Sequence, residues 1–164
     1  MRHIKNFEDL FVEQLKEQFH GERQQHGALM TLREKATDTS LLQAIDHHIG
    51  QVKRQMKSME RVFELLNRNL HGEENVGVKG LIQEAIELAE RCTNDAVRDA
   101  GILSSIQQLN HHNIASFGTL CTYAKELGLE EIKLLLGGSL EEQKSIDQDL
   151  SSLAIDSINL MAMK

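Results

Sequence analysis

The sequence predicts an all-α protein, and three observations favour this fold class. Proline is absent from all 164 residues, where average usage of about 5% would give roughly eight. Aromatic residues make up only 4% of the chain, whereas strands favour aromatic and β-branched side chains. Apolar residues recur every three or four positions over long stretches, which is the period of an amphipathic helix. The length predicts one domain covering residues 1–164.

The charge balance excludes one class of partner, nucleic acid, and the lengths of the apolar runs exclude another, the membrane. The chain has 18 basic and 25 acidic residues, a net charge of −7, and no strongly basic cluster, so we expect no binding to nucleic acid. No apolar run approaches the roughly 20 residues needed to cross a bilayer, and the N-terminus lacks an apolar signal core, so we expect no membrane association. These features predict a cytoplasmic protein.

The cysteines and histidines show no metal-binding pattern. Cys92 and Cys121 lack the spacing of a zinc site and are expected to be buried free thiols. The pairs His47-His48 and His111-His112 are adjacent on helical segments, where neighbours point about 100° apart and cannot chelate through one face. We expect these histidines at the surface or at an interface, with the alternative that one member of each pair reaches the core.

Helix start and stop signals divide the first half of the chain into two long helices. The first is expected to begin after Asn6, a good N-cap, and to end near Lys35. The polar cluster at residues 37–40 breaks the pattern and caps a second helix, whose apolar stripe extends from Leu42 to Leu66. Such a short link makes the two helices an antiparallel hairpin.

The second half contains one short helix and two long ones. Residues 67–77 have the weakest helical pattern and precede a short amphipathic helix at 79–91. A third long helix follows the capping residues 93–95 and stops at Gly128, the residue type that favours the left-handed conformation after a helix end. The last helix is expected from about 129 to 161.

The lengths of the links predict the topology. Two antiparallel hairpins are joined by a connection long enough to cross the whole bundle, and this connection carries the short fifth helix. One long crossover between two hairpins is the ferritin-like four-helix bundle topology.

Polar residues interrupt the apolar stripes near the middle of each long helix. Because all of them lie within about four residues of a helix midpoint, they are expected to share one slab at the waist of the bundle, roughly 6 Å deep. Buried polar groups cost several kcal/mol unless they are paired, so this layer predicts partners, a metal ion or water. Its members are Gln18, Glu22, Gln25 or His26, Gly50, Lys53, Asn110, Asn113, Gln143 and Asp147.

Four stretches carry a resemblance to a known family. They are Phe19-His20-Gly21-Glu22-Arg23-Gln24, Val97-Arg98-Asp99-Ala100, Ile114-Ala115-Ser116-Phe117-Gly118-Thr119-Leu120 and Leu140-Glu141-Glu142-Gln143-Lys144. The whole chain, and these stretches most specifically, resembles the YciE/YciF stress-response family of ferritin-like proteins, formerly a domain of unknown function.

The resemblance implies positions for the ligands of a di-metal site. In that family the first and third long helices each give a glutamate, and the second and fourth each give a carboxylate with a His or Asp one turn later. Glu22 stands at the first glutamate and Asp147 at the final ligand. The other ligand positions hold residues with neither a carboxylate nor an imidazole: Gly50, Lys53, Asn110, Asn113 and Gln143.

This departure predicts that the metal has been lost. A two-metal centre brings about four positive charges and needs several carboxylates to neutralise it, whereas this layer supplies two and adds an ammonium group. We therefore expect no metal cofactor, with Lys53 pairing with Glu22 and Asp147 while the amides complete the hydrogen bonds. Two alternatives remain open: Lys53 extends to solvent along its stem, or a metal occupies the site.

The predicted function follows from this layer. We expect a metal-free ferritin-like stress-response protein with a structural or interaction role, acting as a homodimer and not as an enzyme. The alternative is a metal-binding or redox protein with a reduced, mononuclear iron or manganese site around Glu22 and Asp147. A small-ligand carrier with a cavity at the waist is a third possibility.

Overall fold

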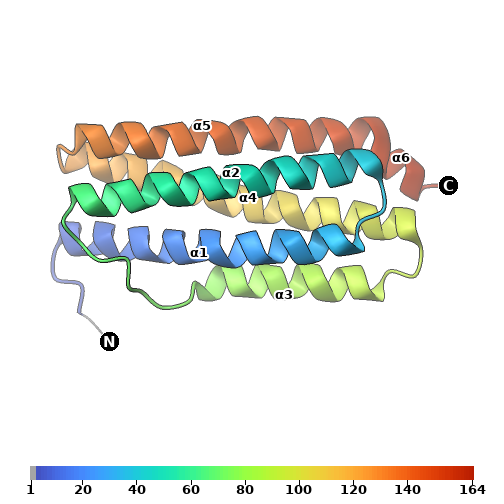
Figure 1. Cartoon of the computed structure of the whole chain (residues 1–164), viewed down its shortest axis with the longest axis horizontal. Coiled ribbons are helices and arrows are strands. Elements are labelled where there is room, and N and C mark those ends of the chain that lie inside the picture. The colour runs from blue at the N-terminus through green and yellow to red at the C-terminus, as the bar shows by residue number, and fades with distance from the viewer. Residues whose placement is uncertain (1–2) are drawn as a thin grey trace.

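The computed structural model describes residues 3–164 and is built from helices connected by short loops, with no strand in this range (Figure 1). The all-α prediction is therefore confirmed. The elements are α1 (Phe7–Lys35), α2 (Thr39–Leu65), α3 (Val76–Arg91), α4 (Asp95–Glu126), α5 (Glu130–Leu153), a π-helical turn η1 (Ala154–Ile158) and α6 (Asn159–Ala162).

Side-chain caps set the starts of α1 to α4. Asn6, Asp38, Asn75 and Asn94 each accept hydrogen bonds from backbone N–H groups of the first helical turn, which otherwise lack partners. At the other end of α4, Gly128 has a φ of +70°, as the stop signal predicted.

The helices form a ferritin-like bundle of two antiparallel hairpins, as predicted. Helices α1 and α2 form the first hairpin, and α4 and α5 form the second (Figure 1). Residues 66–75 and α3 make the crossover, and α3 lies against α1 and α4. Within residues 3–164, no helix is both long and apolar enough to cross a membrane.

Two glycines allow the crossover to approach α1 closely. A Cβ atom on Gly21 would lie 3.1 Å from Val78 Cγ2 of α3, and one on Gly72 would lie 2.9 Å from the ring of His20. The side chain of Gln24 adds two hydrogen bonds to the backbone of Asn75, accepting from its N–H at 2.9 Å and donating to its carbonyl at 3.3 Å. These contacts hold the crossover against the first helix.

The core consists of two apolar clusters with a polar layer between them. One cluster includes Leu29, Leu41 and Ile102, and the other includes Phe11 and Phe117. On each long helix, buried polar side chains lie between the residues of the two clusters. This layer at the waist of the bundle is the candidate functional site.

Candidate functional site

Glu22 is the fully buried carboxyl group of the layer. Its Oε1 accepts a hydrogen bond of 2.9 Å from Gln18 Nε2, and its Oε2 has no hydrogen-bond partner among the described residues. Burial raises the pKa of Glu22 to about 8, and the hydrogen bond from Gln18 opposes this rise only in part. At pH 7 Glu22 is therefore mostly a neutral carboxylic acid.

A chain of buried amides extends from Glu22 across three helices. Gln18 also donates to Asn113 Oδ1 at 3.2 Å, and Asn113 Nδ2 donates to Gln25 Oε1 at 2.6 Å. The amide of Gln25 lies 3.3 Å from His48 Nε2, and since that amide nitrogen is a donor, the ring nitrogen accepts. These hydrogen bonds link polar side chains of α1, α4 and α2, while Glu22 Oε2 and His48 Nδ1 have no partner in the described chain.

The position of His48 corrects one prediction. His48 is fully buried, not at the surface, because it continues the inward stripe of Leu41, Ile45 and Val52 on α2. Burial lowers the pKa of His48 to about 4, so the ring is neutral at pH 7. Its neighbour His47 is exposed, as predicted.

A second group of polar side chains joins α2, α4 and α5. Gln143 Nε2 donates to Gln55 Oε1 at 2.8 Å, and Gln55 Nε2 donates to the backbone carbonyl of Ser139 at 3.3 Å. Asn110 Nδ2 donates to the carbonyl of Gln143 at 3.1 Å and lies 3.4 Å from Asp147 Oδ1. Asn110 and Gln143 therefore belong to the layer, and their amide N–H groups are used within the protein.

Asp147 lies at the rim of the layer. Its side chain is 23% exposed, and its Oδ1 lies 2.9 Å from Nε2 of the exposed His111. Among residues 3–164, no hydrogen bond or ion pair connects Asp147 with Glu22. The two carboxyl groups that match the family pattern consequently have different partners.

The predicted role of Lys53 is wrong. Lys53 is exposed, and in the described part of the chain it forms no ion pair with Glu22 or Asp147. The inward face of α2 carries Val52 and Gln55, and residue 53, about 100° from residue 52, points away from it.

Gly50 is also outside the layer. It is half-buried, and a Cβ atom there would meet only the side chain of Arg54, at 3.7 Å. The second helix instead contributes His48, Gln51 and Gln55, which are all buried. None of these three residues was predicted in the layer, although steps of three and four from Ile45 reach positions 48, 52 and 55, and a step of three from His48 reaches Gln51.

Since Lys53 has no buried partner, Lys53→Met is expected to change the free energy of unfolding by less than about 0.5 kcal/mol, as is usual for a surface substitution. Urea denaturation at pH 7 measures this quantity. A loss of several kcal/mol would instead show that the ammonium group compensates a buried carboxylate.

The layer does not fit a two-metal centre. Within the described chain, no three His, Cys, Asp or Glu side chains are placed to hold a metal ion. Two metal ions bring about four positive charges, and burying charge without compensation is costly. Against this charge the layer offers the carboxyl of Glu22, the rim carboxyl of Asp147, and otherwise the imidazole of His48 and neutral amides.

Another buried carboxylate, Asp99, has a structural role that the sequence analysis did not assign. It accepts hydrogen bonds from the backbone N–H of Thr37 at 2.8 Å, the hydroxyl of Thr37 at 2.7 Å and the backbone N–H of Asp38 at 2.9 Å. Asp99 therefore holds the link between α1 and α2 against the start of α4. An acidic residue in the first turns of a helix is common, so no local pattern marks this role.

Comparisons with known proteins agree with this fold. The model of the domain of unknown function DUF892 matches residues 6–163. Protein YciF of Escherichia coli strain K12 is 34% identical over 160 residues, covering 97% of this chain and 96% of YciF.

Two relatives with solved structures have closely similar folds. The E. coli stress protein YciF matches with a TM-score of 0.91 at 34% identity, covering 95% of this chain and 99% of that chain. YcfI, a proposed structural protein from Rhodopseudomonas palustris, matches with a TM-score of 0.90 at 32% identity, covering 92% of this chain and 96% of that chain.

Proposed function

Because this chain belongs to the family DUF892 and is similar to the stress protein YciF, we propose that it is a stress-response protein whose central layer works without a metal ion. Its role is structural or one of interaction, not catalytic. The observation that carries this proposal is the amide network around a neutral Glu22.

The energetics of this network favour a metal-free layer. A metal ion near Glu22 would have to remove a proton from a group whose pKa is about 8. It would also have to turn the amides of Gln18 and Asn113, whose N–H groups already donate to protein acceptors. Both changes oppose metal binding.

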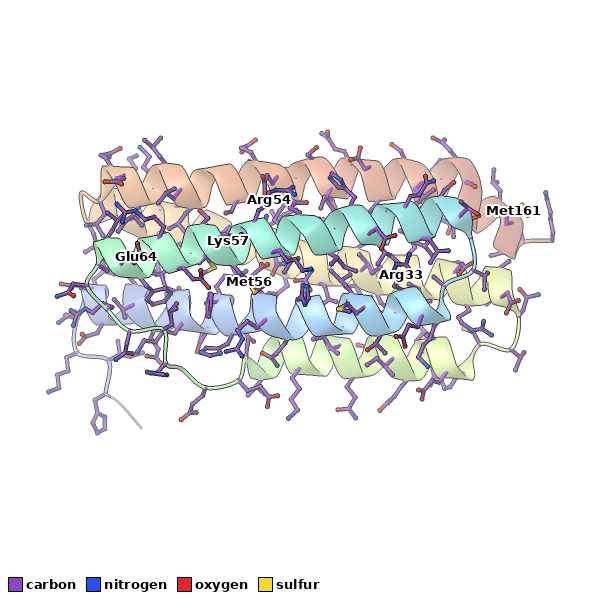
Figure 2. All side chains as sticks on the ribbon, viewed as in Figure 1. Arg33, Arg54, Met56, Lys57, Glu64 and Met161 are labelled. Carbon is purple, nitrogen blue, oxygen red and sulfur yellow. The ribbon has the colours of Figure 1, made fainter. Side chains whose placement is uncertain are left out.

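We further propose that the protein acts as a homodimer in the cytoplasm. Exposed apolar side chains near the C-terminus support self-association: Ile155, Leu160, Met161 and Met163 are each at least 49% exposed, and Figure 2 shows Met161 at the end of the bundle. Sedimentation velocity measures the mass in solution, and a monomer at all concentrations would contradict this part of the proposal.

One observation favours the alternative, a metal-binding or redox protein with a reduced iron or manganese site around Glu22 and Asp147. Four buried oxygens have no hydrogen-bond partner within the described protein, one each from α1, α2, α4 and α5. They are Glu22 Oε2, Gln51 Oε1, Asn110 Oδ1 and Gln143 Oε1.

Elemental analysis separates the two functions. Protein purified from cells supplemented with iron or manganese is expected to contain far less than one metal ion per chain. The matched variant Glu22→Gln should contain the same background amount of metal per chain as the wild type. Stoichiometric metal in the wild type that disappears in Glu22→Gln would overturn the metal-free proposal and establish the alternative.

A further inference from the structure

A groove on the surface, separate from the polar layer, combines an apolar wall with an arginine that has no ion-pair partner among the described residues. It lies between α1, α2 and the crossover segment 66–75 and has a volume of about 470 Å³. This volume is within the roughly 300–1,000 Å³ that is typical of small-molecule sites.

Phe19, Met56 and Leu70 form the apolar wall of the groove. Phe19 is almost completely buried, and its ring packs edge-on against Phe63, with centroids 6.2 Å apart, which fixes its position. Figure 2 shows Met56 at the junction of α2 with α1. The wall therefore offers a hydrocarbon surface held by the bundle itself.

One guanidinium without a partner in the described chain lies beside this wall. Arg23 lines the groove, is exposed, and forms no ion pair or side-chain hydrogen bond within residues 3–164. His26 and His71 line the same groove, and His26 Nε2 is buried without a hydrogen-bond partner. The single carboxylate among the lining residues is Glu60.

The wall that the crossover supplies is held in place. His20 Nε2 lies 3.1 Å from the backbone carbonyl of Leu70 and donates a hydrogen bond to it. Gly72 packs so closely on the ring of His20 that a Cβ atom would lie 2.9 Å from it. The groove is thus formed before any ligand binds, which reduces the entropic cost of binding.

We propose that this groove binds a small organic anion with a carboxylate at one end and a hydrocarbon chain at the other. The guanidinium of Arg23 matches a carboxylate with two parallel N–H groups. The hydrocarbon part lies on Phe19, Met56 and Leu70. This proposal does not depend on whether the central layer holds a metal.

An NMR titration of the full chain with octanoate tests the proposal, with inorganic phosphate as the comparison anion. Octanoate is expected to shift the backbone amide signals of the groove residues with saturation, and phosphate to bind at least about tenfold more weakly because it cannot use the apolar wall. Arg23→Ala should weaken octanoate binding by about tenfold or more.

Matched variants make the result specific. Arg33→Ala removes an exposed arginine of the same helix, outside the groove, and should leave octanoate affinity unchanged. Met56→Gln should weaken octanoate binding without changing the response to phosphate. The absence of saturable shifts, equal affinity for phosphate and octanoate, or unchanged octanoate binding in Arg23→Ala would each overturn the proposal.

Discussion

Replacing Glu22 with glutamine is expected to stabilise the protein by about 4 kcal/mol at pH 8, while the two proteins have similar stability near pH 4.5. Burial raises the pKa of Glu22 from 4.5 to about 8. Below pH 4.5 both the folded and the unfolded chain keep the proton. Between pH 4.5 and 8 only the folded chain keeps it, so the free energy of unfolding falls by about 1.4 kcal/mol per pH unit.

His48 contributes the opposite slope at lower pH. Burial lowers its pKa from 6.5 to about 4, so stability is lost as the pH falls from 6.5 to 4. Between pH 4.5 and 6.5 the contributions of Glu22 and His48 cancel, and above pH 6.5 the loss from Glu22 remains. In Glu22→Gln the stability should therefore rise from pH 4 to 6.5 and then stay level, as far as these two groups determine it.

Urea denaturation at intervals from pH 4 to 9 measures both profiles. The informative quantity is the difference between variant and wild type, because other titrating groups cancel in it. Glu17→Gln, an exposed glutamate on the same helix, is the control and should follow the wild type at every pH. A Glu22→Gln difference that does not change with pH would show that the buried carboxyl is already ionised in the folded protein.

Asp99→Ala is expected to lower the free energy of unfolding by roughly 2–3 kcal/mol. The substitution leaves three donors of Thr37 and Asp38 without their acceptor, and hydrogen bonds to a charged group are stronger than neutral ones. Urea denaturation measures the loss, and hydrogen exchange should show faster exchange of the amides of Thr37 and Asp38.

Asp95→Ala is the matched control for Asp99. Asp95 lies one turn earlier on α4, where its side chain is 69% exposed and pairs with Arg98. Its removal is expected to cost less than about 1 kcal/mol. Equal losses in the two variants would mean that the hydrogen bonds of Asp99 add nothing beyond the charge at the helix start.

The helices and their order were predictable from the sequence because their signals are local. The cap at Asn6 and the stop at Gly128 agree with the structure, and the apolar stripes follow from the helical period alone. The same helical period predicts a buried position for a polar residue that apolar positions flank on both sides. This places Glu22, Asn110 and Gln143 in the interior, and all three are buried.

Only the tertiary structure decided how α2 is rotated and which partners each polar group has. Adjacent residues on a helix point about 100° apart, so a small error in assigning its inward face exchanges exposed Lys53 for buried Gln55. That rotation is determined by packing all the apolar stripes together. Residues far apart in the chain meet at two places: where Asp99 binds the link between α1 and α2, and in the groove beside Arg23. No local signal encodes such contacts, because they exist only after the crossover and the hairpins have packed.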